Sequence, residues 1–471
     1  KVGCKHTTLD NLVCDPGDTC SEMSVCKSGK CQPTASGRLW RHDETQLSST
    51  TVYRASTIAT DGSMVFTGQA LVGGQHKAFV RRVSAKGEPL CSTSFQSAPG
   101  VSTYGVGIFG FGAAGTSSAG SVGVIARTKE PAGGDKYRYG LMAWIEGGGC
   151  TISSYDKSSY FQKWRPHSVF NYPDDAHGTV FEERVNTKTR RLFVYRHWNS
   201  GKEQWNTLGQ PLDAGNYNGV AYALGMAADE ATTGAYLWGP IGKATPEGET
   251  LVFASSFSTH YGHYMGRVGR WDKWGNRIVD TWINYTNAPQ LIEGGAGLVG
   301  GRTVAVGRHC PSGDLANCNG LVVVLDKGGN IVFENATWGG FAVDAYGRAS
   351  GGFDLAVSWF KNGKFVPTMI RWSDQPFVGL WNHPYYDLSG IAKSIQPIPG
   401  SSDFLIGVDG GWGKQATVAR TNLWFHRGCA EAGLCVAKTQ QGCADSNSCD
   451  HDYCTAGAGC QHMKDVSACG L

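Results

Sequence analysis

Long apolar runs are missing from this chain of 471 residues. The longest are short, such as Gly320–Leu325 (GLVVVL), whereas a helix that spans a membrane needs about 18 apolar residues. Charge is scarce and balanced: charged residues make up 17% of the chain, against about 25% in typical globular domains, and the net charge is +3. We therefore expect no membrane insertion, no nucleic-acid partner and no charged tail.

Signatures of catalysis are also missing. The chain contains no G-x-S-x-G nucleophile elbow, so it lacks the local mark of one large hydrolase class. It has no C-x2-C pair, which disfavours zinc as the reason for its cysteines. We expect no cofactor, although calcium is left open, and the sequence leaves catalytic residues unassigned.

Cysteine is rare in the middle of the chain and frequent at both ends. Five cysteines lie in the first 31 residues and seven lie between Cys429 and Cys469, with four others at Cys91, Cys150, Cys310 and Cys318. This number of cysteines without a zinc pattern predicts disulfides, which persist in oxidising compartments. We therefore expect an extracellular or cell-surface protein.

The chain starts at Lys1, without Met and without an apolar signal segment. We interpret it as a mature chain whose export signal was removed, with an engineered start as the alternative. Residues 1–34 and 429–471 are too short to build cores by burial alone, so we predict two disulfide-rich modules there.

The cysteine spacing suggests individual disulfide bonds. Cys310 and Cys318 flank a turn-like segment and are expected to close a hairpin, while Cys91 and Cys150 occupy similar places in successive repeats and could bridge neighbouring blades. The odd numbers at the two ends lead to the hypothesis that one further disulfide joins the N-terminal module to the C-terminal module.

A repeated unit runs through the middle of the chain. Its clearest copies are 271–279 (WDKWGNRIV) and 325–332 (LDKGGNIV), and weaker copies bring the number to seven. Their turns lie near residues 87, 147, 201, 275, 329, 376 and 424. This spacing is close to the roughly 40–50 residues of a four-stranded propeller blade. With abundant Gly, Val, Trp and Tyr, residues 45–428 are predicted to form an all-β, seven-bladed β-propeller, with six or eight blades as alternatives.

The C-terminal segment carries a regular set of cysteines and polar residues. They are Cys443, Asp445, Asn447, Cys449, Asp452, Cys454, Gly459, Cys460 and His462. The segment resembles a cysteine-rich repeat of secreted proteins from myxobacteria and related bacteria, which often follows a propeller-like region. It departs from that repeat at Asp450, where Thr is usual. The middle of the chain likewise resembles the short propeller repeats of secreted bacterial proteins.

Oxygen ligands gather in the same C-terminal segment, at Asp445, Asn447, Asp450 and Asp452. Such hard ligands suit Ca²⁺, although the spacing of an EF-hand loop is lacking. Calcium binding is therefore a hypothesis, and solvated turn residues are the competing interpretation.

An aromatic segment provides the first candidate ligand site: Trp381, Asn382, His383, Tyr385 and Tyr386. Aromatic faces stack on sugar rings, while amide and imidazole groups bind hydroxyls, so the segment is typical of glycan binding. Packing between blades is the competing interpretation for these residues.

Two histidine-containing segments provide further candidates. His260 and His263 could hold a metal ion if a bend brought the two rings together, because residues three apart on a strand face opposite sides. Trp164 and His167 form a smaller cluster of the same ambiguous kind.

Three functions remain open at this stage. The leading hypothesis is a non-catalytic propeller that binds a glycan, a surface or matrix component, or a protein partner. The alternative is an extracellular polysaccharide lyase or hydrolase, which requires a deep channel lined by His, Tyr and Arg with shifted pKa values. A third is a structural subunit that assembles into a surface layer or filament. A propeller serves binding, catalysis and assembly alike, so the fold by itself does not choose among them.

Overall fold

In the computed structural model, the described part of the chain consists of β-strands and two 3-10 helices, Tyr285–Asn287 and Val299–Gly301. The structure describes residues 38–422 with gaps, and the short strands 13–14, 24–27, 30–33, 450–455 and 459–464. The gaps fall at residues 46, 49, 113–115, 130–138, 157–164, 175, 185–188, 199–202, 207–211, 217–240, 259–262, 313–317, 350, 362–363, 374–376, 378, 386–387, 389, 399–402 and 411–415. Within these described ranges no helix is long and apolar enough to cross a membrane.

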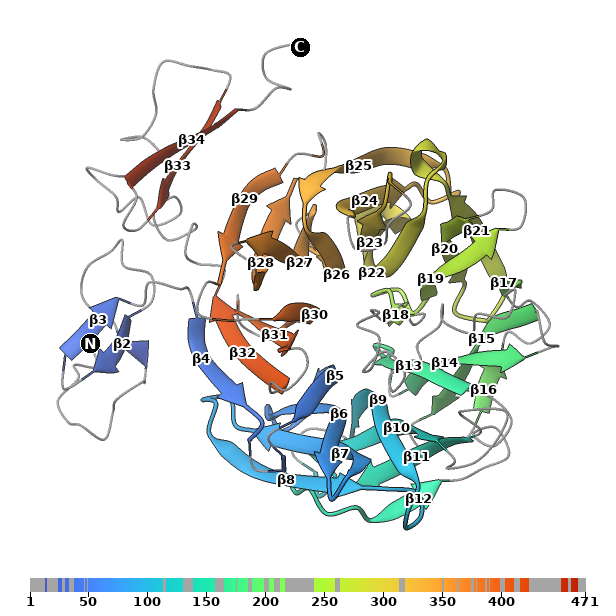
Figure 1. Ribbon diagram of the computed structural model, residues 1–471, viewed down its shortest axis with the longest axis vertical. Helices are drawn as coiled ribbons and strands as arrows, with labels where there is room; N and C mark the ends of the chain where they lie inside the picture. Colours follow the sequence, from blue (N-terminus) through green and yellow to red (C-terminus); the bar gives the residue numbers. More distant parts are fainter. Residues whose placement is uncertain are drawn as a thin grey trace.

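Seven four-stranded antiparallel blades surround a central axis in the described part of the chain (Figure 1). Blades 1 and 2 contain β5 (Thr51–Ile58), β6 (Met64–Val72), β7 (Gln75–Val83) and β8 (Pro89–Phe95), then β9 (Ser102–Phe111), β10 (Ser121–Lys129), β11 (Tyr139–Ile145) and β12 (Ser154–Asp156). Blades 3 and 4 contain β13 (Arg165–Asn171), β14 (Ala176–Arg184), β15 (Thr189–Trp198) and β16 (Glu203–Asn206), then β18 (Ile241–Ala244), β19 (Thr250–Ser258), β20 (His263–Trp271) and β21 (Arg277–Ile283).

Blades 5 and 6 contain β22 (Gln290–Leu298), β23 (Arg302–His309), β24 (Asn319–Leu325) and β25 (Ile331–Gly339), then β26 (Phe341–Gly347), β27 (Phe353–Lys361), β28 (Lys364–Trp372) and β29 (Gly379–Pro384). Blade 7 contains β30 (Ile391–Pro397), β31 (Asp403–Asp409), β32 (Ala416–Asn422) and β4 (Arg38–Asp43). An additional strand, β17 (Leu212–Asn216), pairs with β15 and links blade 3 to β19 of blade 4. The seven-bladed propeller is thereby confirmed, rather than six or eight blades.

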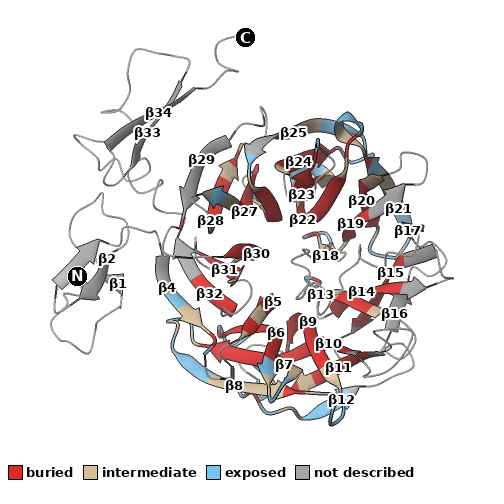
Figure 2. Cartoon of the chain, in the orientation of Figure 1, coloured by how far each residue is buried: buried red, intermediate tan, exposed pale blue. Residues whose placement is uncertain are grey.

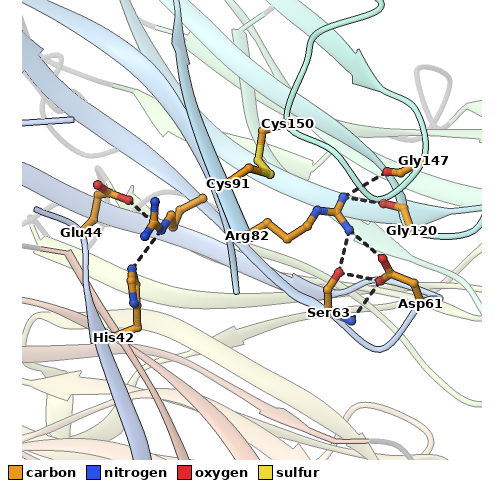
Figure 3. The surroundings of a disulfide bond; sticks show 10 residues. His42, Glu44, Asp61, Ser63, Arg82, Cys91, Gly120, Gly147 and Cys150 are labelled. Carbon is orange, nitrogen blue, oxygen red and sulfur yellow. Dashed lines mark hydrogen bonds and ion pairs between the residues drawn. A yellow bond between two sulfur atoms is a disulfide. The ribbon is translucent and has the colours of Figure 1, made fainter. Parts of the chain in front are cut away.

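The ring is closed by a strand from the N-terminal side. β4 pairs with β32, so the outer strand of blade 7 precedes blade 1 in sequence and lies upstream of the predicted boundary at residue 45. Thr417 Oγ1 donates to Asp43 Oδ1 at 2.5 Å, and Arg81 of blade 1 pairs with the buried Glu44 at 3.3 Å and donates to His42 at 2.9 Å (Figure 3). The strand that precedes blade 1 in sequence thus completes blade 7, and these contacts join the last blade to the first.

Local turn chemistry explains the recurring unit. Asp272 Oδ1 accepts the backbone N–H of Asn276 at 2.8 Å, and Asp326 Oδ1 accepts that of Asn330 at 2.8 Å. The glycine before each asparagine has a positive φ, of 88° and 87°, which only glycine adopts without strain. The two clearest sequence copies therefore form the same turn between the third and fourth strands of successive blades.

Packing between blades forms the core. On β24, Leu321, Val323 and Leu325 pack in one cluster with blade 4. Val322 and Val324 face the other way and pack with blade 6. Because both faces are covered, this strand is a continuous apolar run rather than an alternating one (Figure 2).

A buried arginine joins one blade to the next. Arg82 on β7 donates to Asp61 Oδ2 at 3.1 Å and to Ser63 Oγ at 2.6 Å within blade 1, and to the carbonyl of Gly120 in blade 2 at 2.5 Å (Figure 3). The same arrangement of arginine, carboxylate and carbonyl of the following blade recurs as Arg196 with Asp174 and Gly248, and as Arg270 with Glu249 and Gly301.

Two predicted disulfides are confirmed. Cys91 and Cys150 connect blades 1 and 2, and Cys310 and Cys318 connect β23 to the start of β24 (Figure 3 shows the first). At the chain ends, β1 (Val13–Cys14), β2 (Ser24–Lys27) and β3 (Lys30–Pro33) form one sheet, and β33 (Asp450–Thr455) pairs with β34 (Gly459–Lys464). The disulfide proposed between the two terminal modules lies outside the described residues.

Candidate binding site in the central channel

Six of the seven innermost strands change register at equivalent positions. In each, one residue of the inner strand has no pairing partner, while the neighbouring residues on either side pair with consecutive residues of the second strand. This is the pattern of a β-bulge. The residues at these bulges are Arg54, Val106, His167, Glu293, Val343 and Lys393. A bulge changes the direction of the side chain of the bulged residue, and β-bulges are frequent beside functional sites.

All six bulged residues line one cavity of about 370 Å³ on the propeller axis. Arg127, Lys243 and Asp344 add charged groups, while Ser168, Asn171 and other residues of the inner strands add polar atoms. The cavity thus combines charged, hydrogen-bonding and apolar groups from all seven blades.

Small residues follow most of the bulges because the inner strands approach closely near the axis. A Cβ atom at Gly107 would lie 2.7 Å from Val169 Cγ1, and one at Gly294 would lie 2.5 Å from the carbonyl oxygen of Val343. The G-x-G-x-x-G string that begins at Gly105 belongs to strand β9, so these glycines relate to strand packing rather than to a helix that binds phosphate.

Asp344 occupies the position after the bulge of blade 6, and its carboxylate is buried. It accepts backbone N–H groups from Ala345 at 2.9 Å and from Ile395 of blade 7 at 3.0 Å. Lys243 of blade 4 pairs with the same carboxylate at 3.0 Å. One side chain therefore connects three blades and is neutralised by its partners.

Glu293, the other carboxylate of the lining, is also neutralised. Its Oε1 accepts a hydrogen bond from Arg308 Nε, and both side chains are buried. The Arg308 guanidinium lies 3.6 Å from the centre of the Phe341 ring, a cation–π contact that holds it in place. Neither channel carboxylate is left without a cation.

His167 is held between two charged side chains. Its Nδ1 faces Arg127 Nη2 at 2.9 Å and its Nε2 faces Glu182 Oε2 at 2.8 Å. Since a guanidinium only donates, Nδ1 is the acceptor and Nε2–H donates to Glu182. Burial, together with the charge of Arg127, lowers the pKa of His167 to about 3 although Glu182 opposes the shift, so the ring is neutral.

Tyr53 is likewise committed to the protein. Its hydroxyl bonds to Ser56 Oγ at 2.8 Å and to Ser394 Oγ of blade 7 at 2.5 Å. Burial raises the pKa of this phenol above its usual value. Gln396 adds a second link between the two blades by donating to the carbonyl of Ser56 at 2.6 Å.

Arg54 and Lys393 differ from the other charged groups of the channel. Both are half-buried, and neither has a hydrogen bond or an ion pair with any residue that the structure describes. Burial is the main cause that lowers the pKa of Lys393; Arg54 and Arg308 add to the shift, whereas Asp409 and Glu293 oppose it. The channel lining therefore contains two cationic side chains, Arg54 and Lys393, that form no direct ion pair with any described residue.

The residues singled out from the sequence lie mostly away from this channel. Trp381, Asn382 and His383 belong to β29, the outer strand of blade 6, and Tyr385 is fully buried in the core between blades 6 and 7. Tyr386 lies outside the described residues. A role of this segment in glycan binding stays a prediction.

Among the sequence candidates that the structure describes, His167 is the one that lines the channel. His263 begins β20, where its Nε2 lies 3.2 Å from Asn284 Oδ1, while His260 and Trp164 lie outside the described residues. Among the proposed calcium ligands, Asp450 and Asp452 lie on β33, and their side chains are not described. Asp445 and Asn447 also lie outside the described part.

Sequence reasoning missed Arg54, Asp344 and Lys393. A usable signal exists, because each is the single charged residue in the first strand of its repeat. Aligning the first strands of the repeats would have displayed these positions together.

Comparisons with known proteins add a fold likeness. No protein-family model and no curated protein matches the chain. Solved structures with a similar fold include the polysaccharide lyase Uly1, with 8% identity, coverage of 78% of this chain and 89% of that chain, and a TM-score of 0.47. The GH93 alpha-L-arabinofuranosidase of Fusarium graminearum, in complex with arabinobiose, has 11% identity, coverage of 79% and 93%, and a TM-score of 0.40. The Penicillium chrysogenum alpha-L-arabinanase, also with arabinobiose, has 12% identity, coverage of 64% and 90%, and a TM-score of 0.37. Likeness at this level says nothing about the substrate or activity of this chain.

Proposed function

We propose that this protein is an extracellular propeller that binds an acidic glycan, with an anionic group of the sugar held in the central channel. The observation that carries the proposal is the pair of cations at the bulges of blades 1 and 7. Arg54 and Lys393 face a cavity in which both carboxylates, Glu293 and Asp344, already have cationic partners.

The charge balance of the lining favours an anion. With Lys393 protonated, four cations (Arg54, Arg127, Lys243 and Lys393) and a neutral His167 face two carboxylates, an excess of two positive charges; an excess of one remains when Lys393 is neutral. Holding unpaired cations out of water costs free energy, and an anionic ligand would recover it. A guanidinium matches a carboxylate or sulfate through paired hydrogen bonds, and an ammonium adds a compact charge.

The remaining lining favours a sugar over a simple ion. Asn171 and Ser168 supply polar atoms suited to hydroxyl groups, while Val106, Val343 and Phe170 supply apolar surface suited to the faces of a sugar ring. The volume of about 370 Å³ lies within the ~300–1,000 Å³ range of small-ligand sites. The two disulfides are consistent with an oxidising compartment.

Calorimetric titration tests this proposal. The wild-type protein should bind an oligogalacturonate and not the uncharged oligogalactoside of the same length. Arg54→Gln should weaken that binding by about tenfold or more, because charge-assisted hydrogen bonds contribute about 1.5–3 kcal/mol.

The matched control is Lys86→Gln, which removes a cation from the exposed turn between β7 and β8 and should leave affinity unchanged. A sulfated oligosaccharide in a parallel titration distinguishes sulfate from carboxylate as the preferred anion. Equal affinity for the charged and uncharged sugars, or an Arg54→Gln protein that binds as the wild type does, would contradict the proposal.

A further inference from the structure

We propose that Lys393 is the general base of a β-elimination that cleaves a uronate-containing glycan linked through O4, with Arg54 holding the uronate carboxylate. The inference rests on the proposed function, since the glycan must first bind in the channel. It adds a reaction and assigns separate roles to the two unpaired cations.

The position of Lys393 is the first support. The bulge of β30 places its side chain in the channel lining, half-buried and without a hydrogen bond or ion pair to any described residue. A lysine that is tied to a carboxylate is held protonated, whereas this amine has no such direct partner. It can therefore approach a bound ligand.

The surroundings of Lys393 shift its protonation equilibrium toward the neutral amine that a base requires. The charged groups that act on it are Asp409, Glu293, Arg54 and Arg308. Burial holds the pKa of Lys393 below its usual value, and the two arginines reinforce burial against the two carboxylates. Enzymes lower the pKa of lysine in this way when lysine serves as a base.

Other groups of the lining are poorly placed to remove a proton. Both ring nitrogens of His167 are occupied, by Arg127 and by Glu182. The Tyr53 hydroxyl bonds to two serines, and burial raises its pKa. Asp344 and Glu293 are paired with cations. Among the described lining groups, Lys393 is thus the best candidate for the base.

Arg54 supplies what this elimination needs electrostatically. Loss of the proton from C5 of a uronate places negative charge on the adjacent carboxylate, and a fixed cation there stabilises it. Arg54 lies at the equivalent bulge of blade 1, directly next to blade 7 around the ring, and it also acts electrostatically on Lys393. The two side chains can therefore engage the carboxylate and the C5 proton of one sugar residue.

The reaction balances without a further reactant. The Lys393 amine takes the proton from C5, the C5–H electron pair forms the C4–C5 double bond, and the C4–O4 bond breaks. The ammonium formed on Lys393 then gives its proton to the leaving O4 oxygen, which regenerates the amine. The products are a shortened chain and a fragment with an unsaturated uronate end.

The test separates binding from cleavage by replacing Lys393 with arginine. Lys393→Arg keeps the positive charge but cannot supply a neutral base, because the pKa of arginine exceeds ~12. With polygalacturonate, alginate and hyaluronan as probes, the full-length wild-type protein should generate ultraviolet-absorbing unsaturated ends on at least one of them. Lys393→Arg should bind that probe within about threefold of the wild type and lose at least a hundredfold in rate.

A pH profile provides a readout that a purely structural role would not move. The wild-type rate should rise with pH as the Lys393 ammonium loses its proton, whereas binding should weaken over the same range because the charge is lost. Arg54→Lys, which retains charge, should raise KM more than it lowers kcat.

Each outcome decides between the two proposals. Binding of all three probes without unsaturated ends would overturn the elimination and leave the binding function standing. Cleavage by Lys393→Arg at the wild-type rate would overturn the role of Lys393. Absence of both binding and cleavage with all three probes would overturn the elimination, and absence of binding to the sulfated oligosaccharide as well would overturn the proposed function. Thermal unfolding of each variant identifies any loss of activity that is due to misfolding.

Discussion

Single residues near the axis carry both the stability and the chemistry of the channel. After the bulge, five inner strands have a small residue: Ala55, Gly107, Ser168, Gly294 and Ser394. Blade 6 instead has Asp344, whose carboxylate reaches Lys243 and the backbone of blade 7. At the position after the bulge, blade 6 therefore forms a polar link across the channel. The small residues at the same position in the other five bulged strands leave room for a ligand.

Asp344→Asn should lower the free energy of unfolding by about 3 kcal/mol, because the half-buried Lys243 would lose the buried carboxylate that neutralises it. Urea unfolding monitored by tryptophan fluorescence measures the change. Glu88→Gln is the control, since that carboxylate lies in the exposed turn between β7 and β8, where a charged side chain contributes about 0–1 kcal/mol. If the two variants lost equal stability, the link through Asp344 would have no special role.

At the scale of the elements, each blade is joined to the next by a small number of directional contacts. Arg82 reaches a carbonyl of blade 2, and the Cys91–Cys150 disulfide connects the same two blades. Apolar packing between sheets is not directional, so these contacts help to define how neighbouring blades are placed. The recurrence of the arginine contact at Arg196 and Arg270 shows that it belongs to the repeat.

Removing the disulfide between blades should cost more stability than removing the hairpin disulfide. The cysteines are 59 residues apart in Cys91–Cys150 and 8 apart in Cys310–Cys318, and a longer loop gains more entropy when it is opened. Chain-entropy arguments give about 4 and about 2.5 kcal/mol respectively. The paired variants Cys91→Ala/Cys150→Ala and Cys310→Ala/Cys318→Ala can be compared by urea unfolding. A larger loss for the second pair would show that strain or local packing outweighs loop entropy here.

For the whole molecule, closure of the ring depends on residues that precede blade 1. β4 completes blade 7, and Arg81 of blade 1 contacts Glu44 and His42 just at that junction. The channel lining draws on every blade, so an open ring would not hold Arg54 of blade 1 beside Lys393 of blade 7.

Truncation before and after β4 should separate the terminal module from ring closure. Removal of residues 1–34 should leave the melting temperature within a few degrees of the full chain, because β4 is retained. Removal of residues 1–44 should lower it by more than about 10 °C, since the pairing with β32 is lost. Differential scanning calorimetry measures both shifts. Equal melting temperatures for the two truncations would show that β4 does not contribute to closure.

Much of the fold could be predicted because its determinants are local. The turn around Gly275 and the turn around Gly329 need the same residues in the same order, so the repeat is visible in the sequence. The strand expected before the second clear copy, in Gly320–Leu325, is present as β24, and the structure shows that both of its faces are covered by neighbouring blades. The cysteine spacing also indicated the two disulfides that the structure confirms.

The candidate site could be predicted only in part, through His167. Its other charged members come from different repeats, and no spacing rule relates Arg54 to Lys393 along the chain. Whether a charged residue faces the axis depends on a bulge, which shifts the side chains of a strand by one position. Whether that residue can contact a ligand depends on its partners from other blades. Asp344 is paired with Lys243 of blade 4, whereas Lys393 has no direct ion pair with a described residue.

The amino-acid sequence by itself determined the all-β class, the number of blades, the recurring turn of the two clearest copies and the two disulfides, because each follows from short-range chemistry or from a repeating apolar pattern. Only the tertiary structure decided how the ring closes through β4 and which charges meet in the channel. The physical reason is that both depend on contacts between blades, and such contacts join residues that lie hundreds of positions apart, as Tyr53 and Ser394 do.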